Sequence, residues 1–341
     1  MKKKILFMIH SLDYSGGTEK QIFQLLAKLS ANKYDLHLFI CKYNDRVKNL
    51  KKNGVKIHLL KNFKIHNIFT YFKILKILKK IKPNIVLTYF YKMEFLIFIV
   101  KVFKIIDFNW IMNERTSPLH SDSYIKKLAN FFKLSNIIIS NSWHGKKYWD
   151  RYFKKSLLIN NGYKISNLLV KKKKSKNLRL IFLSRNVSSK NGELFLKLTQ
   201  HLDDKYIPTF VSPKFNQIQK KFKNLRLKRF CKSVNSLYKN QDLLFFPSEF
   251  EGSPNVIYEC FMRKILVLCL RRNYSKLFFK KKLCLEINTK NPYDLSLKLK
   301  KIKNRYLEGK YNSILDNAYN FAKKYSIDNQ VNKYQKIFDK I

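Results

Sequence analysis

Glycine, acidic residues and cysteine are all scarce in this chain of 341 residues. It contains 8 Gly and 22 Asp and Glu, so a glycine or a carboxylate at a predicted turn indicates a local requirement rather than background composition. The cysteines form an odd set of five without a C-x-x-C pair, which suggests neither a zinc site nor a disulfide framework. A reduced, cytoplasmic setting fits this set.

The chain also lacks a long apolar run. The longest, residues 95–100, ends at Lys101 and falls far short of the roughly 20 residues that a membrane span needs. The apolar run 5–9 follows three lysines like a signal peptide, but His10 and Asp13 cut it short, which favours a buried first strand. We therefore expect no transmembrane helix.

Basic residues, in contrast, are abundant, and the formal net charge is +49 at pH 7. Such a charge suggests an anionic partner, whether nucleic acid, a phospholipid surface or a phosphorylated substrate. Only 11 of the 71 basic residues are Arg, and Arg is the residue that nucleic-acid readers prefer. A nucleic-acid partner is therefore disfavoured, and an AT-rich coding sequence explains the lysines as well as a membrane surface does.

Short apolar runs alternate with helical patterns, which predicts βαβ units and parallel sheets. The length suits two domains. Strands are expected at 5–9, 36–40, 55–60, 85–88, 110–112, 137–140, 178–183, 206–210, 242–246 and 265–269. Helices are expected at 20–29, 68–80 and 124–133, from about Gly192, Asn255 and Pro292, and twice within 315–341.

A run of lysines at 171–174 carries no apolar periodicity and is typical of a linker. It separates two similar halves. We expect a first domain at 1–165, a linker at 166–177, a second domain at 178–320 and a closing helix at 321–341.

Gly16 and Gly17 come after the first strand and before a helix, where an open α/β sheet presents backbone amides to a phosphate. A tight strand-to-helix turn explains the two glycines equally well. His10 ends the same strand, and both a ligand contact and a structural role remain open for it.

Arg185 and Lys190 follow the strand at 178–183. Both cations lie at the carboxyl end of a strand, where they could neutralise the diphosphate of a nucleotide donor and stabilise the leaving group.

The most specific segment runs from Phe246 to Glu259. Its carboxylates Glu251 and Glu259 bracket a turn that opens a helix, made of Gly252, Ser253, Pro254, Asn255 and Val256. One carboxylate could contact sugar hydroxyls and the other a ribose diol. Alternatively, Glu251 is a solvent-facing loop acid and Glu259 a surface charge of the helix.

This segment resembles the E-x7-E signature of retaining glycosyltransferases with the GT-B fold, particularly family 4. Three further features resemble that family in the same order: Gly16-Gly17-Thr18-Glu19, Asn161-Gly162, and Ser184-Arg185 with Lys190. The resemblance covers about residues 5 to 270. It implies two Rossmann-like domains that face each other across a cleft, the first for the acceptor and the second for the nucleotide-sugar donor. It also implies a C-terminal helix that crosses back to the first domain.

The resemblance also implies roles for individual residues. Glu251 would contact the donor sugar, Glu259 the nucleotide ribose, and Arg185 and Lys190 the phosphates, with the glycine loop and the turn 252–256 completing the donor site. Such enzymes are usually metal-independent and need no cofactor. The donor would be a nucleotide sugar and the acceptor a glycan or lipid-linked sugar, in surface polysaccharide or lipopolysaccharide biosynthesis.

The chain departs from the family pattern at three places. After Glu259, small residues followed by Gly and Pro are replaced by Cys260-Phe261-Met262-Arg263-Lys264-Ile265-Leu266. A glycine-rich donor loop is replaced by Arg271-Arg272-Asn273, and a catalytic His is replaced by a segment that contains Glu114 and Arg115, as in a variant subgroup. Either residue could touch the acceptor or donor, or serve the loop structure. A catalytically silent basic binding protein and a nucleotide-sugar epimerase therefore stay open as alternatives.

The predicted helix 68–80 places Lys73, Lys76 and Lys80 on one stripe among apolar residues. This basic amphipathic pattern suits an anionic bilayer surface, although a core helix with one wet face would share it. Peripheral association with the inner face of the cytoplasmic membrane is the resulting hypothesis.

Overall fold

The computed structural model describes residues 1–13, 16–29, 31–115, 131–153, 156–165, 175–183, 190–212, 225–229 and 234–341. Arg185, residues 116–118, most of the predicted linker and most of the predicted helix 124–133 lie outside these ranges. The described chain forms two compact units, residues 1–162 with 327–341 and residues 163–326.

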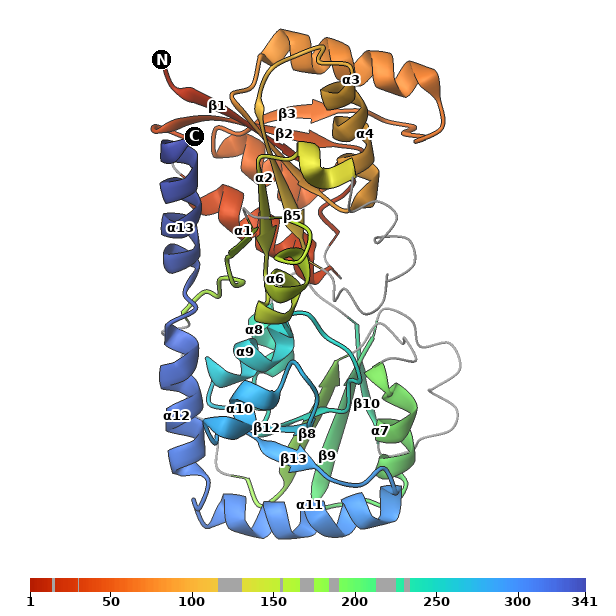
Figure 1. Cartoon of the computed structure of the whole chain (residues 1–341). Coiled ribbons are helices and arrows are strands. Elements are labelled where there is room, and N and C mark those ends of the chain that lie inside the picture. Colours follow the sequence, from red (N-terminus) through yellow and green to blue (C-terminus); the bar gives the residue numbers. More distant parts are fainter. Residues whose placement is uncertain are drawn as a thin grey trace. The chain divides into compact units, whose positions relative to one another are not determined.

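The first unit is a parallel sheet with helices on both faces (Figure 1). Its strands stand in the order β3-β2-β1-β4-β5-β6-β7. The strands are β1 (Lys3–Met8), β2 (Tyr34–Ile40), β3 (Lys56–Leu59), β4 (Ile85–Tyr89), β5 (Asn109–Glu114), β6 (Ile137–Ser140) and β7 (Ser156–Leu158). The helices are α1 (Gly17–Lys28), α2 (Asp45–Lys52), α3 (Ile68–Ile81), α4 (Tyr91–Val102), the 3-10 helix η2 (Phe131–Leu134), α6 (Trp143–Trp149) and α13 (Ile327–Lys340).

Strand β1 shows why both faces of this sheet are covered. Ile5 and Phe7 belong to the core that contains residues of α1, α2 and α13. Leu6 and Met8 belong to the opposite core, with residues of α3, α4 and α6. Alternate side chains of a strand point to opposite faces, so a continuous apolar strand requires cover on both sides.

The second unit repeats this plan with the strand order β10-β9-β8-β11-β12-β13. Its strands are β8 (Leu178–Leu183), β9 (Tyr206–Val211), β10 (Arg226–Lys228), β11 (Leu243–Phe246), β12 (Leu266–Leu270) and β13 (Leu285–Ile287). Its helices are α7 (Gly192–Thr199), α8 (Val234–Tyr238), α9 (Asn255–Phe261), α10 (Lys276–Lys280), α11 (Pro292–Leu307) and α12 (Asn312–Lys323). The predicted α/β class with two Rossmann-like parallel-sheet domains is confirmed.

Helix α13 returns the chain to the first unit. Its Tyr334 and Phe338 are fully buried in the core beside α1. A Cβ on Gly162 would lie 2.8 Å from the Cα of Ile327, so only glycine fits where this helix begins. That close approach supplies the physical reason for the Asn161-Gly162 pair.

The strand orders locate the crevices in which open parallel sheets bind ligands. The order reverses between β1 and β4 in the first sheet and between β8 and β11 in the second. Ligands bind outside the carboxyl ends of strands at such switch points. Candidate site residues should therefore follow β1, β4, β8 and β11.

Candidate active site

In the second unit, Glu251 and Lys190 form an ion pair. Glu251 follows β11, Lys190 follows the segment after β8, and the two strands are hydrogen-bonded neighbours. The Ser248 hydroxyl also donates to Glu251 Oε1 at 3.0 Å. The structure thus brings together two of the predicted site residues, and Glu251 is not the solvent-facing loop acid of the alternative interpretation.

Glu259 lies on α9 and is only 8% exposed. The Tyr238 hydroxyl donates to its Oε2 at 2.7 Å. Burial, together with the nearby negative charge of Glu259, raises the pKa of Tyr238, so this hydroxyl keeps its proton as a donor. The interpretation of Glu259 as a surface charge is therefore wrong.

Helix α9 begins at Asn255, with Pro254 as its N-cap residue. The Asn255 side chain accepts a hydrogen bond from the Tyr163 hydroxyl at 2.9 Å. Tyr163 in turn stacks on Tyr258, with ring centroids 4.8 Å apart. These contacts fix the start of α9. Gly252 and Ser253 in the turn before it and Val256 in its first turn are partly exposed.

The segment Arg271-Arg272-Asn273, which replaces a glycine-rich loop, is tied to the Glu251 loop. Arg272 donates to Glu249 at 2.7 Å, and the Tyr274 hydroxyl donates to the Ser248 carbonyl at 2.8 Å. Burial tends to raise the pKa of Glu249, but hydrogen bonds from Arg272 and Lys290 outweigh it and lower the pKa. From the sequence, Arg271 and Arg272 were recognised only as a departure from the family's glycine-rich loop. Their contacts with the Glu251 loop were not predicted.

In the first unit, Gly16 is the N-cap residue and Gly17 the first residue of α1. A Cβ on Gly16 would lie 1.7 Å from the Glu19 carboxylate, which therefore occupies the space in front of the first turn. A carboxylate at a helix N-terminus is favoured by the exposed amides and the helix dipole. Glu19 thus holds a negative charge where the resemblance expects a phosphate.

His10 follows β1 and packs its ring edge-on against Phe63, with ring centroids 5.9 Å apart. Burial, together with the positive charges of Lys42 and Lys92, lowers the pKa of His10. The imidazole is therefore neutral at physiological pH, which leaves it able to donate or accept a hydrogen bond at this edge of the sheet.

Arg115 is buried and engaged by its own unit. Its Nη1 donates to Asn161 Oδ1 at 2.8 Å and its Nη2 to the Tyr334 hydroxyl at 2.6 Å. The Tyr334 hydroxyl donates to Asn113 at 2.7 Å. Of the two roles left open for Arg115, these contacts favour the structural one, because they tie the end of β5 to α13.

Two residues after β4 were missed from the sequence. Phe90 has φ 67° and ψ 148°, a backbone conformation that residues other than glycine rarely adopt. Glu94, one helical turn later, is 5% exposed, and burial together with the charge of Glu114 raises its pKa well above the ordinary value. The only sequence signal was an acid beside the longest apolar run.

The described ranges hold neither a cluster of metal ligands nor a membrane-spanning helix. Within them, no three His, Cys, Asp or Glu side chains gather where they could hold a metal ion. Nor does any helix of the described part have the length and apolarity to cross a bilayer.

Two parallel-sheet units with polar residues at both switch points, and a helix that returns to the first unit, define the glycosyltransferase GT-B fold. No protein-family model matches the sequence. It is 25% identical over 280 residues to the capsular polysaccharide biosynthesis glycosyltransferase CapH of Staphylococcus aureus, covering 74% of this chain and 77% of that protein.

Solved structures agree on the fold. HepE from Anabaena, in complex with UDP and glucose, has a TM-score of 0.80 at 13% identity over 99% of this chain and 100% of that one. A variant of S. aureus TarM, in complex with Fondaparinux, alpha-GlcNAc-glycerol and UDP, has a TM-score of 0.76 at 14% identity over 98% of this chain and 99% of that one. Sequence and fold together support transferase activity.

Proposed function

We propose that the chain is a retaining glycosyltransferase of the family 4 type that moves a hexose from a nucleotide sugar to a glycan or glycolipid acceptor. The observation that carries this proposal is the Lys190–Glu251 ion pair beside the buried Glu259–Tyr238 hydrogen bond, at the switch point of the second sheet. The similarity to CapH, a glycosyltransferase of capsular polysaccharide biosynthesis, supports an acceptor that belongs to surface polysaccharide biosynthesis. Lipopolysaccharide is a further member of that acceptor class.

The nucleotide in this proposal is UDP, because the HepE and TarM complexes both contain UDP. Glu259, held by Tyr238, accepts hydrogen bonds from the ribose hydroxyls. Glu251 accepts them from the donor sugar. Lys190 and Arg185 neutralise the diphosphate, as the position of Lys190 at the carboxyl end of the sheet suggests.

Donor binding would also rearrange the ion pair. An incoming diphosphate carries more charge than one carboxylate, so Lys190 exchanges Glu251 for phosphate oxygens. Glu251 is then released toward the sugar hydroxyls. Until the donor arrives, the ion pair holds both side chains at the site.

The reaction in this proposal needs neither a resident metal nor a cofactor. The bond between the anomeric carbon and the phosphate oxygen breaks, and the acceptor hydroxyl attacks from the face that the phosphate leaves. The acceptor oxygen forms the new glycosidic bond, and its proton goes to the departing phosphate. Lys190 and Arg185 stabilise the charge that grows on that phosphate.

Thermal stabilisation by nucleoside diphosphates and nucleotide sugars tests the donor site, since ligands that bind only the folded state raise its stability. We expect UDP and its sugar derivatives to raise the thermal midpoint of the wild type. Glu259→Ala, Arg185→Ala and Lys190→Ala should each reduce this rise. A chain that no nucleotide stabilises would instead be the silent binding protein. Nucleotide release that requires an acceptor would separate the transferase from an epimerase.

A lipid-linked acceptor would be reached at a membrane, and we propose peripheral association with the inner face of the cytoplasmic membrane. Helix α3 leaves Ile68, Phe69 and Phe72 exposed in its first turns, and its lysines begin at Lys73. Apolar and basic residues on one helix suit the interface of an anionic bilayer. Co-sedimentation with anionic vesicles that declines as salt is raised would support this association, and no binding at low salt would refute it.

A further inference from the structure

The carboxyl edge of the first sheet gathers acidic residues in a chain that has few of them. The net charge is +49, and only 22 residues are Asp or Glu. Four of these follow the central strands: Asp13 and Glu19 come after β1, Glu94 comes after β4, and Glu114 ends β5. Such an edge repels phosphate and other anions, so a ligand that binds here should be uncharged.

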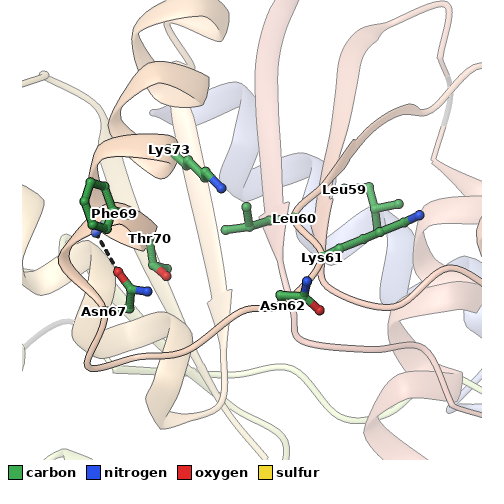
Figure 2. A pocket seen from close by; sticks show the side chains of 8 residues that line it. All are labelled: Leu59, Leu60, Lys61, Asn62, Asn67, Phe69, Thr70 and Lys73. Carbon is green, nitrogen blue, oxygen red and sulfur yellow. Dashed lines mark hydrogen bonds between the residues drawn. The ribbon is translucent and has the colours of Figure 1, made fainter.

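The end of β3, at the same edge of the sheet, is basic instead. A cavity of about 540 Å³ lies there, between the end of β3 and the first turn of α3 (Figure 2). Lys61 and Lys73 line it, and none of its eight described lining residues is acidic. The Lys61 side chain extends away from Lys73, so the two ammonium groups do not converge on one anion. The acids therefore gather at the switch point beside β1 and β4, and not along the whole edge.

The carboxyl group of Glu94 is buried without a hydrogen-bond partner among the described residues. Glu94 is 5% exposed, and burial together with the charge of Glu114 raises its pKa well above the ordinary value. Buried polar groups of folded proteins almost always have a partner, so an unsatisfied one at a ligand crevice indicates that a ligand supplies it. The raised pKa favours the protonated form, which can both donate to a hydroxyl group and accept from it.

Phe90 supplies an apolar surface one helical turn before Glu94. The Glu94 amide donates to the Phe90 carbonyl at 3.2 Å, so both residues belong to the first turn of α4. Phe90 is 38% exposed, and its backbone has the strained φ of 67°. Strain of this kind clusters at ligand sites, where the surrounding structure holds it. Here it keeps an exposed aromatic residue at the switch point.

An aromatic ring beside a neutral carboxyl group suits a pyranose. One face of a pyranose carries C–H groups, which pack on the negative face of an aromatic ring, and its edge carries hydroxyl groups. We propose that Phe90 and Glu94 form the subsite for an uncharged hexose of the acceptor, with the Phe90 ring against the sugar and the Glu94 carboxyl group hydrogen-bonded to one hydroxyl. The proposal rests on the transferase function proposed above, and it assigns the acceptor contact of that function to two residues.

The test measures sugar binding and donor binding on the same samples of the full chain. Methyl glycosides of the common hexoses and N-acetylhexosamines are the probes, and ligand-observed NMR titrations in the presence of UDP give their dissociation constants. Thermal midpoints with and without UDP report on the donor site. Glu94→Ala and Phe90→Ala are compared with Asp107→Ala and Phe103→Ala, which alter an exposed acid and an exposed aromatic residue beyond the other end of α4.

We expect at least one glycoside to bind the wild type. Glu94→Ala should weaken its binding about tenfold and Phe90→Ala about fivefold, the usual effects of a lost hydrogen bond and a lost ring contact. Glu94→Gln, whose amide still donates to a hydroxyl, and Phe90→Tyr, which keeps the ring, should stay within about threefold of the wild type. Both control variants should bind as the wild type does.

Three results would overturn the subsite. One is a wild type that binds none of the glycosides, and another is undiminished binding by Glu94→Ala and Phe90→Ala; the donor site stands in both cases if UDP still raises the thermal midpoint. The third is a loss of UDP stabilisation in these two variants together with sugar binding, which would show that the residues serve the fold. If UDP does not stabilise the wild type although a glycoside binds through Phe90 and Glu94, then the donor site is wrong and the sugar subsite stands.

Discussion

The two sheets carry polar residues at the carboxyl ends of their central strands, but they use them in different ways. After β8 and β11, opposite charges are paired, as in Lys190 with Glu251. After β4 and β5, burial and the charge of Glu114 raise the pKa of Glu94, which lies one helical turn after the strained backbone of Phe90. The second edge is thus prepared to exchange one anion for another, whereas the first disfavours a second negative charge.

That difference fits a donor site in the second unit and an acceptor site in the first, as the family resemblance implies. A charged diphosphate can displace Glu251 from Lys190 because it offers more negative charge. A raised pKa favours the protonated form of Glu94, and a neutral carboxyl group can donate a hydrogen bond to an uncharged sugar hydroxyl. Substitutions at four residues would break or sharpen this contrast.

The largest expected effect concerns Arg115, which we assign to structure rather than to ligand binding. Arg115→Ala removes hydrogen bonds to Asn161 and Tyr334 inside the first unit. The free energy of unfolding should fall by about 3 kcal/mol, because buried partners lose a charged donor. Urea denaturation measures this change. Full stability together with lost acceptor use would instead identify Arg115 as a ligand contact.

Lys190→Ala should have the next largest effect, on donor affinity. A charge-assisted hydrogen bond is worth about 2 kcal/mol, so donor KM should rise about thirtyfold. Lys197→Ala is the matched control, since Lys197 pairs with Glu193 on the surface of α7. The control should stay close to wild type in a steady-state assay, and a similar rise in KM for both variants would contradict a specific role.

Glu94→Gln should change the pH dependence of stability. The folded-state pKa of Glu94 is raised, so its contribution is fully present below the ordinary value near 4.5 and is lost as pH rises through the folded pKa. The variant should therefore gain more than about 1 kcal/mol over wild type at high pH, and nothing at acidic pH. Thermal midpoints across pH test this, with the exposed Glu193→Gln as the control. A constant difference at all pH values would refute the assignment.

Substitutions of Phe90 should give the smallest difference in stability, but the direction of that difference is clearly defined. At an ordinary position glycine is less stable than alanine, but at φ 67° and ψ 148° alanine bears the backbone strain and glycine does not. Phe90→Gly should therefore be more stable than Phe90→Ala by about 1 kcal/mol. Urea denaturation of the two variants gives the order, and the reverse order would show that the strain is absent.

Local patterns predicted most of the strands and the fold class, because apolar runs in a doubly covered sheet are continuous. The short strands β7, β10 and β13, each of three residues, were not predicted, since three residues carry too little pattern. Helix α4 was also missed. Its largely apolar sequence lacks the polar stripe that marks an amphipathic helix.

Candidate site residues could be named from the sequence where a motif concentrates them, whereas structural contacts between distant segments could not be predicted. Glu251 and Glu259 lie within one segment, whereas Arg115 reaches Tyr334 across 219 positions. No residue near Arg115 in the sequence indicates that Arg115 is buried against α13. The positive φ of Phe90 could not be predicted either. A glycine at this position would have indicated such a backbone conformation, and an aromatic residue does not.

Helix α13 also has a consequence for how the protein is made. A ribosome synthesises a chain from its N-terminus to its C-terminus, and domains generally fold as they emerge from it. The second unit, residues 163–326, is complete before α13 has been synthesised, whereas the first unit still lacks Tyr334 and Phe338 from its core. The half of the protein that is translated first is therefore the half that finishes folding last, and until then it exposes an apolar sheet face that chaperones can bind.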